Sequence, residues 1–141
     1  MKSRCFIDTN VFIYAFEFPE SNCAKILDLL NQNEVEGVIS ERVLTEVMHY
    51  FKKNYHKDLA SLVRLYVLEA CILVPSTEVK EEMENWSGEI KDKDMEQLSV
   101  VKSKGIKYLV AYDRDFAPFE EYYTPKEFVK KLGLSAFESQ Y

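Results

Sequence analysis

The sequence has few residues that interrupt regular secondary structure and no glycine-rich loop. Its 141 residues include 4 glycines and 4 prolines, a scarcity that favours helices with short connections. Without a glycine-rich phosphate-binding loop, a nucleoside triphosphatase has no support. No repeat, low-complexity tract or flexible linker is visible. We therefore expect a single domain over residues 1–141.

Cysteine and histidine are scarce and poorly placed for metal binding or covalent catalysis. The three cysteines, Cys5, Cys23 and Cys71, are an odd number without metal-like spacing. We expect them to be small buried side chains in a reducing compartment. The two histidines, His49 and His56, have no cysteine or serine partner at a suggestive spacing. A catalytic histidine is therefore not expected.

Long apolar runs are also missing. No run approaches the roughly 20 residues that a membrane-spanning helix needs, although hydrophobic residues make up 47% of the chain. Lys2 and Arg4 precede a short apolar stretch, but Asp8 interrupts it and no small-residue cleavage site follows. We expect a cytoplasmic protein with no membrane partner.

Positive charge is in deficit, because the net charge is −6. This balance argues mildly against a nucleic-acid partner. However, acids gathered in one metal site would count as negative in the sum and still be neutralised in use. Basic residues that could contact phosphates, unless they are ordinary surface charge, are Arg42, Lys52, Lys53, Lys57, Lys91, Lys93 and Arg114.

Hydrophobic periodicity predicts short buried strands that alternate with helices. Strands are expected at 3–7, 37–39, 71–74 and 107–111, and helices at 11–16, 21–31, 41–54, 58–70, 76–86, 94–104 and 125–132. Thr9 or Asn10 is expected to cap the first helix, and Ser40 and Thr124 two later ones. This order predicts an α/β fold, a three-layer α/β/α sandwich with a central, mostly parallel sheet.

Four acidic residues stand where such a fold places its functional sites. Asp8 and Asp113 follow predicted strands, and sites in parallel sheets collect at the carboxyl ends of strands. Glu46 and Asp94 interrupt or flank the apolar faces of predicted helices. These helices could bring both acids to the crevice at the carboxyl ends of the strands. Carboxylates there cost free energy unless they are compensated, and Mg²⁺ or Mn²⁺ is the usual compensation.

The acids also have structural interpretations. Asp8 and Asp94 are favourable at helix starts, Asp113 suits a turn, and Glu46 could lie on a solvated flank. As metal ligands, however, the four would suit hydrolysis of a phosphodiester. A small-molecule phosphatase is less well supported, because its usual pattern of two aspartates separated by one residue is not met by Asp8-Thr9-Asn10.

These residues, taken together, resemble the PIN-domain ribonucleases, which include the VapC toxins of toxin–antitoxin pairs. The motifs that carry the resemblance over nearly the whole chain are Ile7-Asp8-Thr9-Asn10, Glu46, Asp94, Asp113-Arg114-Asp115-Phe116 and Tyr123-Thr124-Pro125-Lys126-Glu127-Phe128. The resemblance implies a parallel sheet flanked by helices. It also implies cleavage of RNA with Mg²⁺ or Mn²⁺, a homodimer, and an antitoxin protein as a possible partner.

The resemblance also implies roles for particular residues. Asp8 would be the principal metal ligand, followed by the other three catalytic acids, Glu46, Asp94 and Asp113. Asn10 matches a polar position that helps to hold the first aspartate or a metal-bound water. The accessory acids would be Asp92 and Asp115.

One position departs from the family pattern. Ala111 stands where the family commonly has serine or threonine. The missing hydroxyl could loosen the site without removing metal binding. The alternative function is therefore a catalytically weak PIN-fold module that binds RNA or protein.

Overall fold

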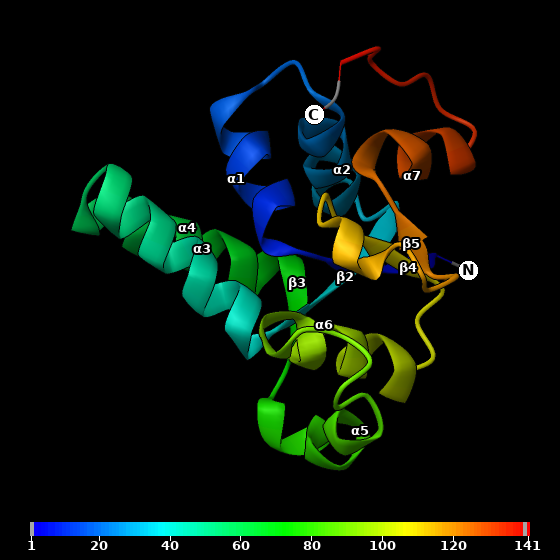
Figure 1. Cartoon of the computed structure of the whole chain (residues 1–141). Coiled ribbons are helices and arrows are strands. Elements are labelled where there is room, and N and C mark those ends of the chain that lie inside the picture. Colours follow the sequence, from blue (N-terminus) through cyan, green and yellow to red (C-terminus); the bar gives the residue numbers. More distant parts are fainter. Residues whose placement is uncertain (1, 140) are drawn as a thin grey trace.

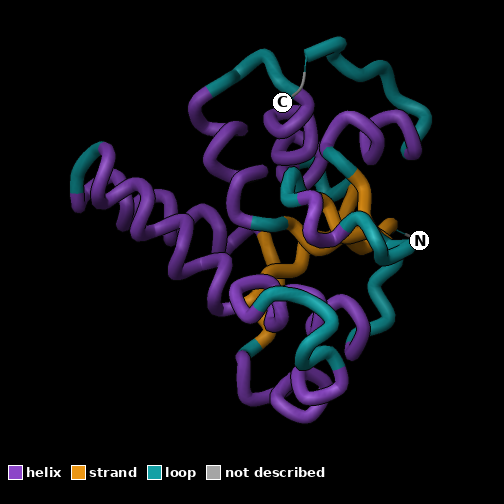
Figure 2. The backbone as a smooth tube through the Cα atoms, viewed as in Figure 1, coloured by secondary structure: helices purple, strands orange, loops and turns teal. Residues whose placement is uncertain are grey.

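A single parallel sheet lies at the centre of the molecule. The computed structural model describes residues 2–139 and 141 (Figures 1 and 2). The strands are β1 (Ser3–Ile7), β2 (Val35–Ser40), β3 (Cys71–Val74), β4 (Tyr108–Val110) and β5 (Tyr122–Tyr123). They form a 5-stranded sheet in the order β3-β2-β1-β4-β5, with every neighbouring pair parallel. The predicted α/β/α fold is confirmed.

The strand order places β1 in the middle and reverses direction beside it. From β1 the chain steps outward through β2 to β3, then crosses back to β4 and β5 on the other side. Phe6 of β1 pairs with Val38 of β2 and with Leu109 of β4. In parallel sheets such a reversal leaves a crevice at the carboxyl ends of the two diverging strands. Here those strands are β1 and β4.

Helices cover both faces of the sheet. They are α1 (Thr9–Glu17), α2 (Asn22–Asn31), α3 (Glu41–Asn54), α4 (Lys57–Ala70), α5 (Lys80–Asn85), α6 (Asp92–Ser103) and α7 (Pro125–Lys131), with short 3₁₀ turns at Ser76–Val79 and Arg114–Phe116. In Figure 1, α1, α2 and α7 lie on one side and α5 and α6 on the other. Helices α3 and α4 form a hairpin that projects from the sheet. No helix of residues 2–139 has the length and apolar character of a membrane span.

The core is apolar and contains all three cysteines. Cys5, Phe6 and Ile7 of β1 are fully buried, and Cys23 and Cys71 are buried beneath neighbouring helices and strands. Burial raises the pKa of the Cys23 and Cys71 thiols to about 12. These thiols therefore stay protonated and behave as small apolar side chains, as the sequence predicted.

Of the three sets of capping residues that the sequence predicted, two are confirmed and one is not. Ser40 Oγ accepts a hydrogen bond from the Val43 backbone N–H (3.2 Å), and Thr124 forms the predicted capping box with Glu127. The predicted helix at 11–16 is confirmed, but its start was predicted wrongly, because the helix begins at Thr9 and Asp8 holds the N-cap position. The Asp8 backbone N–H still bonds to Val110 O (3.0 Å) as in the sheet, so the helix starts directly after it.

Candidate metal centre

Asp8 lies at the carboxyl end of β1, on the crevice between β1 and β4. Its side chain is only 8% exposed. It makes no capping hydrogen bond, and Oδ1 has no hydrogen-bond donor among the residues that the structure describes. A buried carboxylate oxygen without a donor is costly in a folded protein. Helix capping therefore does not explain this side chain.

Asp94 enters the same crevice from the first turn of α6. The residue is 3% exposed. Its buried Oδ2 forms an ion pair with the Lys93 ammonium, whose Nζ lies 3.1 Å away. The predicted inward position of Asp94 is confirmed, although the helix begins two residues earlier, at Asp92.

Asp113 and Asp115 approach Asp94 from the turn after β4. The carboxylates of Asp94, Asp113 and Asp115 each offer an oxygen within 4.8 Å of the others. Asp113 Oδ1 also accepts a hydrogen bond from the Asp115 backbone N–H (2.9 Å), which fixes the turn. Asp113 therefore has both the turn role and the position that the sequence predicted, and Asp115 joins the cluster.

Glu46 reaches the opposite edge of the site from α3. Its Oε1 accepts a hydrogen bond from Thr9 Oγ1 (2.7 Å), and Arg42 Nε lies 3.8 Å from Oε2. Glu46 is partly exposed, so it borders the crevice rather than filling it. The Thr9 hydroxyl, which does not cap α1, holds this carboxylate next to Asp8.

The electrostatics of the site reflect this crowding. Burial, followed by the charges of Glu46 and Asp94, raises the pKa of Asp8 to about 7, although the Thr9 backbone and the Gln97 side chain act in the opposite direction. Burial also raises the pKa of Asp94, against the effect of Lys93. Burial would raise the pKa of Asp113 too, but the hydrogen bonds from Lys93 and Asp115, together with the charge of Lys93, outweigh it and lower the pKa. The acids repel one another where no cation intervenes.

Two predicted accessory residues lie at the margin. Asp92, the first residue of α6, is exposed and does not belong to the cluster of Asp94, Asp113 and Asp115. Asn10 is exposed on the first turn of α1, where its side chain makes no hydrogen bond within residues 2–139.

Two residues that the sequence analysis did not assign to the site lie within it. Gln97 is 2% exposed, lies one helical turn after Asp94, and has an Oε1 atom without a donor among the described residues. The sequence signal that could have identified Gln97 is a polar side chain at an inward position of a predicted helix. Lys93, considered only as a phosphate contact, places its ammonium group among the carboxylates.

The donor set fits a hard divalent cation. The cluster of Asp94, Asp113 and Asp115 and the neighbouring Asp8 offer carboxylate oxygens only, and Asp8 Oδ1 is buried without a donor in the described chain. Mg²⁺ and Mn²⁺ prefer such oxygen ligands, whereas zinc sites usually contain histidine or cysteine. A divalent ion would satisfy Asp8 Oδ1 and offset the repulsion between the acids.

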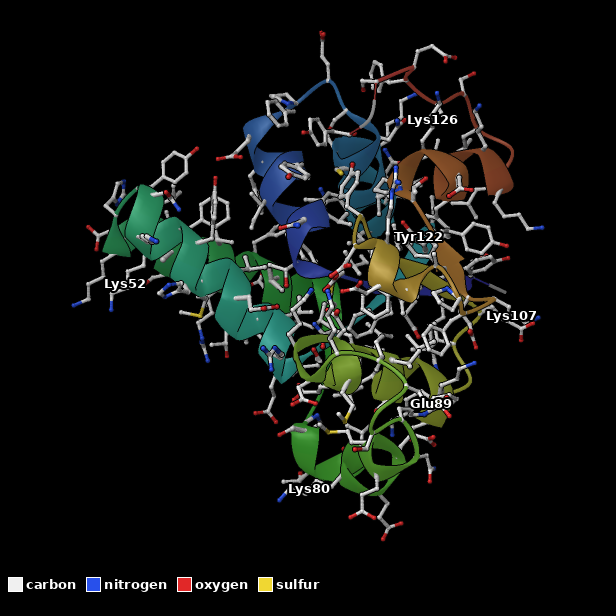
Figure 3. All side chains as sticks on the ribbon, viewed as in Figure 1. Lys52, Lys80, Glu89, Lys107, Tyr122 and Lys126 are labelled. Atoms are coloured by element: carbon white, nitrogen blue, oxygen red, sulfur yellow. The ribbon has the colours of Figure 1, made fainter. Side chains whose placement is uncertain are left out.

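Two hollows adjoin the acids. One, of about 580 Å³, is lined by Thr9, Ile13, Thr45, Glu46, His49, Tyr50, Lys53 and Asn54. The other, of about 360 Å³, is lined by Gly88, Glu89, Ile90, Lys91 and Asp115. Lys52 instead points away from the sheet at the outer end of the α3–α4 hairpin (Figure 3). The surface beside the acids therefore has room for an extended ligand.

A family model described as "PIN domain" matches residues 4–115. The chain therefore belongs to the PIN-domain family, which includes nucleases. A search of curated protein sequences gives no match.

Solved structures share this fold at low sequence identity. A toxin–antitoxin complex from Klebsiella pneumoniae is 20% identical, with a TM-score of 0.68 over 87% of this chain and 98% of that chain. VapC20 from Mycobacterium tuberculosis, a sarcin-ricin loop cleaving toxin, is 18% identical, with a TM-score of 0.61 over 81% and 93%. VapBC2 from Rickettsia felis, bound to a DNA fragment from its promoter, is 19% identical, with a TM-score of 0.60 over 86% and 96%.

Proposed function

We propose that this chain is an endoribonuclease that depends on Mg²⁺ or Mn²⁺ and hydrolyses RNA phosphodiester bonds. The ligand set would be Asp8, Asp94 and Asp113, with Glu46 at the edge and Asp115 as an accessory acid. The observation that carries the proposal is Asp8 Oδ1, a buried oxygen that has no hydrogen-bond donor in the described chain, next to the buried carboxylate of Asp94. Hydrogen bonding and helix capping leave the Asp8 oxygen unexplained.

The side chains have distinct tasks in this mechanism. A divalent ion held by Asp8, Asp94 and Asp113 would make a water more acidic and would offset the charge that develops on the phosphate. Asp8, whose pKa is about 7 without the ion, must release its proton to become a ligand. Thr9 orients Glu46 by its hydrogen bond, so that the Glu46 carboxylate stays at the crevice. Because Asp8 must be ionised to bind the metal, RNA cleavage should slow as the pH drops below 7.

The hollow along α3 would hold part of the RNA strand. Arg42, His49 and Lys53 lie one or two turns from Glu46 along this helix, and the last two line the hollow. Lysine and arginine beside the acids would neutralise phosphates that the acids themselves repel. This local arrangement supports RNA as the substrate despite the overall charge of −6.

Cleavage of RNA by the wild type and by Asp8→Asn, with Mn²⁺ and with excess chelator, tests the proposal. The wild type should cut only with the metal, and the variant should lose at least about 100-fold in rate, because its principal ligand loses its charge. Circular dichroism of both proteins verifies that the variant is folded. Equal rates in the two proteins would reject the function.

A catalytically weak binding module is the second candidate. Ala111, buried at the end of β4, offers no hydroxyl next to the acids. RNA binding that is unaffected by chelator and by Asp8→Asn, without cleavage, would favour this candidate. Metal-dependent cleavage would exclude it.

We also propose a toxin role with an antitoxin protein as partner, and a homodimer. The fold neighbours include toxin–antitoxin complexes, and α4 exposes the apolar side chains Leu62 and Leu65. Growth arrest on expression, relieved by the product of an adjacent gene, would support the toxin role. Growth unaffected by expression of an active nuclease would count against it. Light scattering of the purified chain tests the dimer.

A further inference from the structure

Lys93 inserts one positive charge into the carboxylate cluster. Its Nζ lies 2.5 Å from Asp113 Oδ2, 3.1 Å from Asp94 Oδ2 and 3.6 Å from Asp115 Oδ2. The side chain is half-exposed, so it reaches this position from the solvent side. A single ammonium therefore contacts the same three carboxylates whose oxygens lie within 4.8 Å of one another.

These contacts conflict with those that a divalent ion needs. Asp94 Oδ2, a buried oxygen of a proposed metal ligand, lies 3.1 Å from the ammonium. A metal on these oxygens would face Lys93 at a few ångströms, and two cations at that separation repel each other strongly.

We propose that Lys93 is a built-in counter-ion of the metal-free site that competes with the divalent ion for Asp94 and Asp113. In the metal-free protein the ammonium offsets the repulsion between the carboxylates. When the ion binds, the long, flexible lysine side chain turns away from the acids toward the solvent. The inference rests on the proposed metal site and adds that the resident lysine weakens metal affinity.

Lys93→Gln tests this competition directly. Calorimetric titration with Mn²⁺ should show that the variant binds the ion about three- to tenfold more tightly than the wild type, because both the competitor and its repulsion are gone. The metal-free melting temperature of the variant should be lower than that of the wild type, and the rise in melting temperature on adding Mn²⁺ should be larger. A merely structural lysine would not produce the larger rise.

Two matched variants complete the experiment. Lys93→Arg keeps the charge and should restore affinity to near the wild-type value. Lys104→Gln removes the same charge near the far end of α6, where Lys104 pairs with Glu78 (2.8 Å), and should leave metal affinity unchanged. If Lys93→Gln does not fold, tighter binding by Lys93→Met is the required result.

The outcomes separate this inference from the proposed function. If the wild type binds Mn²⁺, Asp8→Asn loses that binding, and the neutral Lys93 variants bind equally or more weakly, the competition is wrong and the metal site stands. If the wild type binds no Mn²⁺, both proposals fail.

Discussion

Asp8 is a buried acid whose negative charge needs a compensating cation. It sits at the end of the central strand, nearly buried, and its pKa is raised to about 7 by burial and by neighbouring acids. An aspartate whose folded-state pKa exceeds its unfolded value is held in its protonated form by folding. It therefore reduces stability as the pH rises from about 4 through 7. In the metal-free protein, ionised Asp8 is a stability cost.

Asp8→Asn should therefore stabilise the metal-free protein above pH 7. The expected gain in the free energy of unfolding is on the order of 4 kcal/mol at pH 8 and near zero at pH 4. Urea unfolding in chelator at the two pH values measures it. Asp92→Asn removes an exposed charge nearby and should change stability by less than about 1 kcal/mol at either pH. A variant less stable than the wild type at pH 8 would contradict the assigned environment.

At the scale of elements, α3 carries both an acid and a path for the substrate. Lys53 lies two turns beyond Glu46 and lines the same hollow, while Lys52, one residue before, points away from the sheet. The two lysines therefore form a matched pair, because they have the same charge and their side chains point in different directions.

Lys53→Gln should weaken RNA binding several-fold and lower the dependence of log affinity on log salt by about 0.7, the value for one phosphate contact on a single strand. Fluorescence anisotropy with the Asp8→Asn protein, which leaves the RNA intact, measures both quantities. Lys52→Gln should have at most a small effect. Equal losses in the two variants would show that the hollow is not the RNA path.

The sequence predicted well the short strands that contain consecutive apolar residues. The strands at 3–7 and 71–74 have the predicted bounds. The expected helix at 76–86 is instead a 3₁₀ turn followed by α5, because the chain leaves helical geometry at the buried Val79. Strand β5 has only two residues, so its pattern is too short to detect. It is held to the sheet by hydrogen bonds that the backbone N–H groups of Leu109 and Ala111 donate to the carbonyl groups of Glu121 (2.7 Å) and Tyr123 (3.0 Å).

The acids of the site were predictable for a physical reason that does not extend to Lys93. Asp8 and Asp113 follow buried strands, and a parallel sheet brings such positions together. A lysine at a helix start, in contrast, resembles an ordinary surface charge. Only the fold places Lys93 beside Asp113, which is 20 residues away.

At the scale of the whole molecule, folding of the sheet determines where negative charge gathers. The reversal of strand order at β1 and β4 brings carboxylates from three segments into one crevice. Folding therefore concentrates negative charge that a bound cation would offset. Metal binding should appear as a change in global stability.

Mn²⁺ should raise the melting temperature of the wild type. At a hundredfold excess over its dissociation constant, the ion contributes about 2.7 kcal/mol to the free energy of unfolding. Differential scanning calorimetry measures the shift, which should shrink below pH 7 as Asp8 takes up its proton. A shift of the same size in Asp8→Asn would assign the ion to another part of the molecule.

The central claim is that acids distant in the sequence form one divalent-metal site. Its most direct test is an anomalous difference map from a crystal of the protein grown with MnCl₂. We predict one or two manganese peaks in coordinating contact with Asp8 and with Asp94 or Asp113. Crystals saturated with Mn²⁺ that hold no ion in contact with Asp8, or in which the carboxylates stay paired only with Lys93, would contradict the account.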